Sequence, residues 1–187
     1  MSVKEKFLDY VSYDTQSDSS STTMPSTMKQ KLLAQHLADE MVAMGIEDAH
    51  MDEWGYVYGT IPANCEKKNV VGFIAHMDTV SDFCDHDIKP IVTENYDGGE
   101  LRLGTSDTIL SPKNFPHLAD LKGRTLITSD GTTVLGADDK AGIAEIMTMI
   151  ERVQEEKIPH GPLCVAFTPD EEIAVSYTHL TLPTNSL

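Results

Sequence analysis

The stretch that decides the fold is residues 70–78, which read VVGFIAHMD. The β-branched and aromatic residues before His76 predict a buried strand. His76 and, two residues later, Asp78 then lie at the carboxyl end of that strand, where ligands bind in open α/β sheets. Residues i and i+2 of an extended segment project to the same side, so Asp78 can accept a hydrogen bond from the His76 ring. The pair suits a metal ligand with its orienting carboxylate, or a plain hydrogen-bonded pair at a strand end.

The composition is that of a globular protein with a large acidic excess. The chain has 187 residues, 40% hydrophobic and 24% charged, which is enough for one domain with a core. Its 30 acidic and 14 basic residues give a net charge of −16. This charge argues against nucleic acid and against an anionic membrane surface as partners. Most of the acidity is expected to serve solubility, while a few carboxylates could be held together by cations.

The cysteines and the N-terminus bear on the cellular compartment. Cys65, Cys84 and Cys164 are far apart and form no Cys-x-x-Cys pair, so a thiolate zinc site is not expected. An odd number of cysteines without a disulfide framework suits a reducing compartment. The first residues lack the apolar core of a signal peptide, and no apolar run reaches membrane-spanning length. We therefore expect a cytoplasmic protein.

Strand-like and helix-like patterns alternate along the chain, which predicts an α/β fold with a mixed, partly parallel sheet flanked by helices. Helices are predicted at 2–11, from Pro25 to near Met44 and at 140–154, and strands within 51–61 and at 70–76, 125–128 and 163–168. The predicted apolar stripe of the second helix contains Met28, Leu32, Leu37, Met41 and Met44. The long segment 81–121 is expected to hold a hairpin and a short helix near Phe115.

A second acidic motif, GADDKAG at 136–142, lies between a predicted strand and a predicted helix. Its small residues leave the carboxylates of Asp138 and Asp139 unobstructed. Both acids stand at a helix N-terminus, where the helix dipole favours negative charge. Taken alone, the motif favours a helix cap over a metal ligand.

A third acidic motif, TPDEE at 168–172, follows the predicted strand 163–168. Three consecutive acids repel one another unless a positive charge lies nearby, although a solvated loop is the plainer reading. If the three chain turns converge, they gather a mixed nitrogen and oxygen ligand set suited to Zn²⁺, Mn²⁺ or Co²⁺. Because this set has more carboxylates than one ion needs, two bridged metals with a free Glu as base are expected. The candidate site residues are His76, Asp78, Asp138, Glu171 and Glu172.

Four blocks of the sequence resemble the peptidase T family, the tripeptide aminopeptidases among the co-catalytic zinc exopeptidases. They are YVSYDTQS at 10–17, IAHMDT at 74–79, LGADDKAG at 135–142 and AFTPDEEI at 166–173. The resemblance covers residues 1 to about 173 and implies a zinc-exopeptidase-like catalytic domain.

The resemblance implies a role for each candidate residue. His76 would ligate one metal ion, expected to be Zn²⁺, with Mn²⁺ and Co²⁺ as alternatives, and Asp78 would orient that histidine. Asp138 would bridge two metal ions, and a cis peptide bond is expected after it. Glu171 would act as the general base on a bridging water, and Glu172 would ligate the second ion. The substrate would be a small peptide.

The chain also departs from the family pattern. Family members are about twice as long, and their later sequence supplies a further acidic ligand, a second histidine ligand and a lid domain that dimerises. We therefore expect residues 1–173 to be the N-terminal part of the catalytic domain. Residues 174–187 contain no charged side chain and are expected to be a non-native or frame-shifted tail, unless they are an ordinary exposed end. This chain alone is expected to bind metal weakly and to be nearly inactive.

Three other functions stay open at this point. A related dipeptidase or N-acyl amino-acid deacylase would use the same metal core. An acidic, non-catalytic metal-binding or assembly module also fits. A metal-dependent phosphoesterase fits less well, because no phosphate-cradling Gly-rich loop or basic clamp is evident.

Overall fold

The computed structural model describes residues 1–84 and 86–173, in two compact units. Among the described residues, the first unit contains 1–81 and 136–173, and the second contains 82–84 and 86–135. The predicted tail at 174–187 lies outside the described residues.

The first unit is built on a four-stranded sheet in the order β1-β2-β8-β3. The strands are β1 (His50–Met51), β2 (Val57–Ile61), β3 (Val71–His76) and β8 (Leu163–Thr168). Strand β8 pairs antiparallel with β2 and parallel with β3. The predicted α/β class with a mixed, partly parallel sheet is therefore confirmed.

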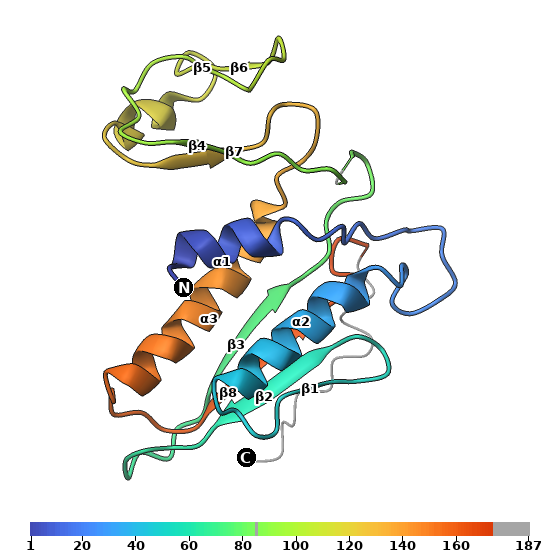
Figure 1. Cartoon of the computed structure of the whole chain (residues 1–187), viewed down its shortest axis with the longest axis vertical. Coiled ribbons are helices and arrows are strands. Elements are labelled where there is room, and N and C mark those ends of the chain that lie inside the picture. The colour runs from blue at the N-terminus through green and yellow to red at the C-terminus, as the bar shows by residue number, and fades with distance from the viewer. Residues whose placement is uncertain (85, 174–187) are drawn as a thin grey trace. The chain divides into compact units, whose positions relative to one another are not determined.

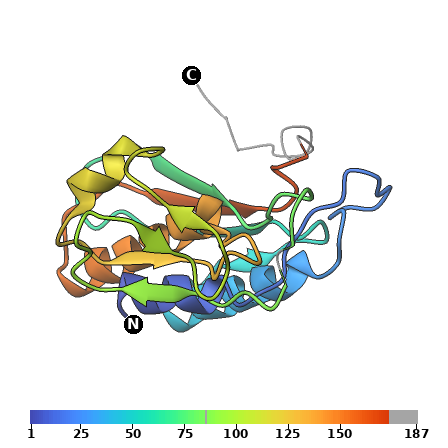
Figure 2. The same cartoon turned by 90° about the horizontal axis from the view of Figure 1, so that it is seen from above.

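Three helices lie on one face of this sheet (Figures 1 and 2). They are α1 (Val3–Tyr10), α2 (Gln30–Ala43) and α3 (Ala137–Glu155). The helix predicted at 140–154 is confirmed by α3, and its apolar residues are buried: Ile143, Ile146, Met147, Ile150 and Val153. The 3.6-residue period of that helix turns these side chains toward the sheet.

The predicted apolar stripe of α2 is only partly right. Leu37 and Met41 are fully buried, but Met28 and Leu32 are 52% and 66% exposed. Helix α2 begins at Gln30, so Met28 precedes it, and the buried face is instead formed by Leu33, Ala34, Leu37, Ala38 and Met41. The predicted end of the helix is confirmed, because Gly45 has a φ of +84°, a conformation that favours glycine after a helix.

The expectation that β3 is a buried strand is wrong for its first half. Val71 is 46% exposed and Ile74 is 53% exposed, and only Ala75 and His76 are buried. The reason is position, because β3 is the outer strand of the sheet as described, whereas β8 has a strand on each side. Gly72 and Ile74 border a hollow of about 390 Å³ together with residues of β2 and β8.

The register of the parallel pair brings two motifs level with each other. Val71 pairs with Leu163, and five residues later His76 pairs with Thr168. The next backbone contact, from Met77 N to the Thr168 carbonyl oxygen at 2.8 Å, extends the pairing into the following loops. The first and third motifs, HMD at 76–78 and TPDEE at 168–172, therefore leave the sheet at the same edge.

The second unit contains short elements. Strands β4 (Ile91–Thr93) and β7 (Leu126–Thr128) pair antiparallel, as do β5 (Leu101–Arg102) and β6 (Ile109–Leu110). A 3₁₀ helix covers Pro116–Leu121. The predicted hairpin and the short helix near Phe115 are thus confirmed. In the part of the chain that is described, no helix combines the length and the apolar character needed to span a membrane.

Candidate metal centre

His76 lies where three chain segments meet. Its Nε2 atom is 2.9 Å from Oδ1 of Asp138 and 3.9 Å from Oε2 of Glu171. On the other side of the ring, Nδ1 is 3.1 Å from the backbone oxygen of Asp78 and 3.5 Å from its Oδ1. The imidazole is only 11% exposed. The structure therefore brings together one residue from each of the three motifs, with Asp78 behind the ring.

Asp78 is fully buried and binds the loop that carries the two glutamates. Its Oδ1 accepts the backbone N–H of Glu171 at 2.8 Å, and its Oδ2 accepts that of Glu172 at 3.1 Å. The carboxylate thus fixes the backbone of both glutamates as well as facing the His76 ring. The sequence predicts only the contact between Asp78 and the His76 ring. It does not predict the bonds to Glu171 and Glu172, because these residues are more than 90 positions away from Asp78.

The start of α3 separates the two candidate roles of its aspartates. The Asp138–Asp139 peptide bond is cis, as the resemblance implied, and both residues have non-helical backbone angles. Asp139 Oδ1 accepts the N–H of Gly142 at 3.1 Å, so this residue caps the first regular turn. Asp138 is free of that task and faces His76, with a side chain that is 86% exposed. The structure thus gives the capping role to Asp139 and leaves the carboxylate of Asp138 beside His76.

Electrostatics at this site favour positive charge. Burial lowers the pKa of His76, but contact with Asp78 and Asp138 and the charge of Glu171 outweigh it and raise the pKa to about 9. Burial raises the pKa of Glu172; His76 lowers it, and the carboxylates of Asp78, Asp138 and Glu171 raise it further. The carboxylates around the imidazole repel one another when they are ionised. A cation bound among them would relieve that repulsion and be stabilised by it.

The full predicted ligand set is not assembled in the structure. Within residues 1–84 and 86–173, no group of three or more His, Cys, Asp or Glu side chains is arranged to hold a metal ion. Glu172 lies on the surface, and only its backbone N–H is fixed, by Asp78. His76 and Asp138 contact each other directly. The assignment of His76, Asp138 and Glu172 as ligands therefore stays a prediction.

The first acid of the third motif, Asp170, was not singled out from the sequence. It is 1% exposed and points away from the two glutamates, toward Ser26 and Gln30. A run of three acids gives no indication that one of them is an internal anchor. The Ser/Thr-rich segment that binds it looks like an ordinary polar loop in the sequence.

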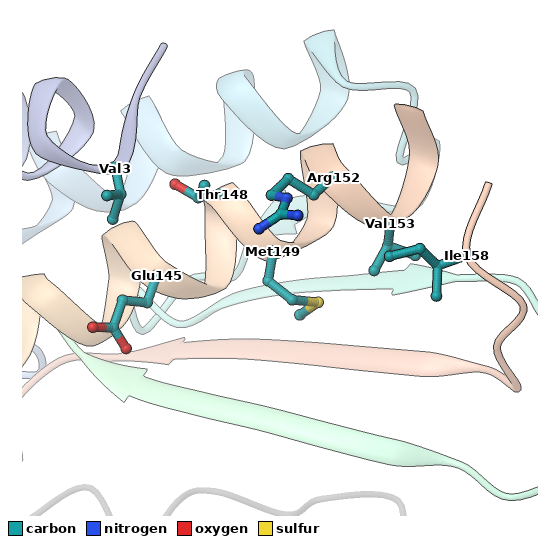
Figure 3. A pocket seen from close by; sticks show the side chains of 7 residues that line it. All are labelled: Val3, Glu145, Thr148, Met149, Arg152, Val153 and Ile158. Carbon is teal, nitrogen blue, oxygen red and sulfur yellow. The ribbon is translucent and has the colours of Figure 1, made fainter. Parts of the chain in front are cut away.

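A separate hollow of about 400 Å³ lies beside the start of α1 and along α3 (Figure 3). Its lining consists of Val3, Glu145, Thr148, Met149, Arg152, Val153 and Ile158. None of the five candidate site residues is among them, so this hollow is not part of the candidate centre.

Comparison with known proteins places the chain. No protein-family model matches it. Peptidase T of Desulfitobacterium hafniense (strain DSM 10664 / DCB-2) is 55% identical over 175 residues, which are 92% of this chain and 42% of that protein. A tripeptidase from Staphylococcus aureus is 28% identical with a TM-score of 0.58, covering 91% of this chain and 36% of that one.

The solved structure of aminopeptidase PepT from Bacillus cereus agrees in fold. Its TM-score is 0.66 at 24% identity, over 96% of this chain and 39% of that one. The chain thus spans about two-fifths of the length of the relatives it matches. More than half of the matched residues are identical to those of D. hafniense peptidase T. The chain is therefore a homologue of peptidase T, and it corresponds to about two-fifths of the length of that protein.

Proposed function

We propose that this chain carries part of the active site of a metal-dependent aminopeptidase that releases the N-terminal residue from tripeptides. The observation that carries the proposal is the meeting of His76, Asp138 and Glu171, from three separate chain segments, behind which Asp78 fixes the glutamate loop. The substrate class rests on the homology to peptidase T.

The donor set fits a divalent cation. One imidazole nitrogen and several carboxylate oxygens are the ligands that Zn²⁺, Mn²⁺ and Co²⁺ accept. His76 and Asp138 have donor atoms 2.9 Å apart, and His76 is held from behind by Asp78. We infer that His76, Asp138 and Glu172 would hold two ions. Further ligands would come from the part of the peptidase T sequence that lies outside the match to this chain.

When bound, two such ions would acidify a water molecule and polarise the scissile carbonyl. Glu171 is the proposed general base. Its side chain is 38% exposed, so it can reach solvent and substrate, and its backbone is fixed by Asp78. It would take a proton from the attacking water and return it to the leaving amine. Asp78 has both oxygens engaged by backbone N–H groups, so its proposed role is to hold the loop and the imidazole.

Metal binding by the 187-residue chain tests the first part of the proposal. Saturating Zn²⁺ is expected to raise the unfolding temperature, because a ligand at about 100 times its Kd stabilises by about 2.7 kcal/mol. His76→Ala should abolish that shift. His50→Ala is the matched control, since the His50 ring contacts the Asp48 backbone oxygen instead. A zinc shift that survives His76→Ala would contradict the proposed centre.

Catalysis is tested in a chain completed with the remaining sequence of the D. hafniense relative. That protein should hydrolyse trialanine with Zn²⁺ added, whereas the 187-residue chain should show little turnover. Glu171→Gln in the completed chain should abolish hydrolysis while the zinc-induced stabilisation survives. A requirement for a free α-amino group separates an aminopeptidase from a deacylase, and equal turnover of N-acetylated substrate would favour the deacylase.

A further inference from the structure

A buried carboxylate next to the glutamate pair is bound by a distant part of the chain. Asp170 accepts the backbone N–H of Ser26 at 2.6 Å and the Nε2–H of Gln30 at 2.7 Å, and it also accepts the Ser26 hydroxyl. In return, Gln30 Oε1 accepts the Asp170 backbone N–H at 3.2 Å. All three residues are buried, and Gln30 is fully so. Every donor in this cluster is neutral, so the carboxylate is stabilised by directed hydrogen bonds.

The position of Asp170 gives this cluster its significance. The residue directly precedes Glu171, and its φ of +55° turns the backbone sharply at that point. On the far side of the turn, Asp78 binds the N–H groups of Glu171 and Glu172. Two buried carboxylates thus hold the loop that carries the proposed base. Asp170 directly precedes Glu171, and Asp78 lies in the loop that follows β3.

The segment that binds Asp170 also binds the end of β3. We name residues 16–30 the N-terminal brace. Ser17 donates its backbone N–H and its hydroxyl to the Thr79 carbonyl oxygen, each at 3.1 Å. Gln16 Nε2 donates to the Val80 carbonyl oxygen at 3.2 Å. The N-terminal brace therefore forms hydrogen bonds with the chain just after β3 and just after β8, next to His76 and Glu171.

We propose that Asp170 is a positioning residue, which sets the backbone of Glu171 and Glu172 through its bonds to Ser26 and Gln30 of the N-terminal brace. The inference rests on the proposed function only in that it takes Glu171 as the base and Glu172 as a ligand. Asparagine could not replace Asp170 without loss, because its amide NH₂ would face donors where the carboxylate presents acceptors.

Amide hydrogen exchange of the 187-residue chain, without metal, tests the positioning directly. Ser26→Ala removes one donor to Asp170 and should speed exchange at the Glu171 and Glu172 amides by about tenfold or more, because local opening exposes them. The amide of Met147 in α3 should be unaffected. Ser26→Thr keeps the hydroxyl and should restore slow exchange at both glutamates.

Ser20→Ala is the matched control. The Ser20 hydroxyl also donates to an aspartate in the same segment, Asp18 Oδ1 at 2.7 Å, but that pair is exposed and does not touch Asp170. Ser20→Ala should leave exchange at Glu171 and Glu172 unchanged.

Two results would overturn the positioning role. Exchange at Glu171 and Glu172 could stay slow in Ser26→Ala, or it could rise equally at Met147, which would mean a general loss of stability. Neither result depends on metal, so a failure of the proposed function would show separately, as an absent Zn²⁺-induced stabilisation in the unsubstituted chain.

Discussion

Strands β8 and β3 form one parallel pair, yet their surroundings differ. In β8 only Cys164 is more than slightly exposed, whereas in β3 the first four residues are exposed or half-buried. At their carboxyl ends the difference disappears, because Ala75, His76, Phe167 and Thr168 are all buried. The fold therefore buries β3 only where it delivers the candidate site.

This difference shows which part of β3 is under structural constraint. The whole strand pairs with β8, but only its carboxyl end is buried, and it leads into Asp78, which binds the Glu171 amide. Its amino half contributes less to the core of the first unit. Substitutions along the two strands should therefore have unequal effects that grow toward the site.

The largest expected contrast is between Phe167→Ala and Ile74→Ala. Phe167 is fully buried in β8, and its truncation should cost about 3 to 5 kcal/mol of unfolding free energy. Ile74 in β3 is 53% exposed, so its truncation should cost less than about 1 kcal/mol. Urea unfolding followed by circular dichroism measures both. Equal costs would mean that β3 is as enclosed as β8.

A smaller effect is expected at the carboxyl end of β3. Asp78→Ala leaves the N–H groups of Glu171 and Glu172 without their acceptor, which should cost about 2 to 3 kcal/mol. Asp107→Ala is the control, because Asp107 is fully exposed and should change stability by less than about 0.5 kcal/mol. If the two variants unfold at the same urea concentration, the loop is not held through Asp78.

The smallest contrast has opposite signs and uses two strand glycines. A Cβ at Gly59 in β2 would lie 2.2 Å from Met41 Cε, so Gly59→Ala should destabilise by about 1 to 2 kcal/mol as Met41 moves aside. A Cβ at Gly72 in β3 would meet nothing within 4 Å. Gly72→Ala should therefore stabilise by about 0.4 to 1 kcal/mol, by restricting the unfolded chain. A destabilised Gly72→Ala variant would show that this face of β3 is occupied in solution.

The sequence predicted the elements well where a local pattern determines them. The bounds of β8 match the prediction, and the buried face of α3 follows from its helical period. The burial of β3 could not be predicted in this way, because an apolar run does not reveal whether its strand is central or outer.

The candidate site was predictable in part. The convergence of His76, Asp138 and Glu171 followed from acids placed at chain turns beside strands. The bonds that organise the site did not, because Ser26 and Asp170 are 144 residues apart and Asp78 and Glu171 are 93 apart. Such long-range hydrogen bonds leave no periodic trace in the sequence.

The level pairing of β3 with β8 limits how this chain can be lengthened or shortened. His76 and Thr168 face each other, and the two anchoring aspartates each follow two positions later. Deleting one residue from either strand would turn its inward side chains outward and carry one aspartate away from its donors. Length changes should therefore be tolerated in the hairpin of β5 and β6 but not between Leu163 and Asp170, which makes the hairpin the better place to insert a tag or a probe.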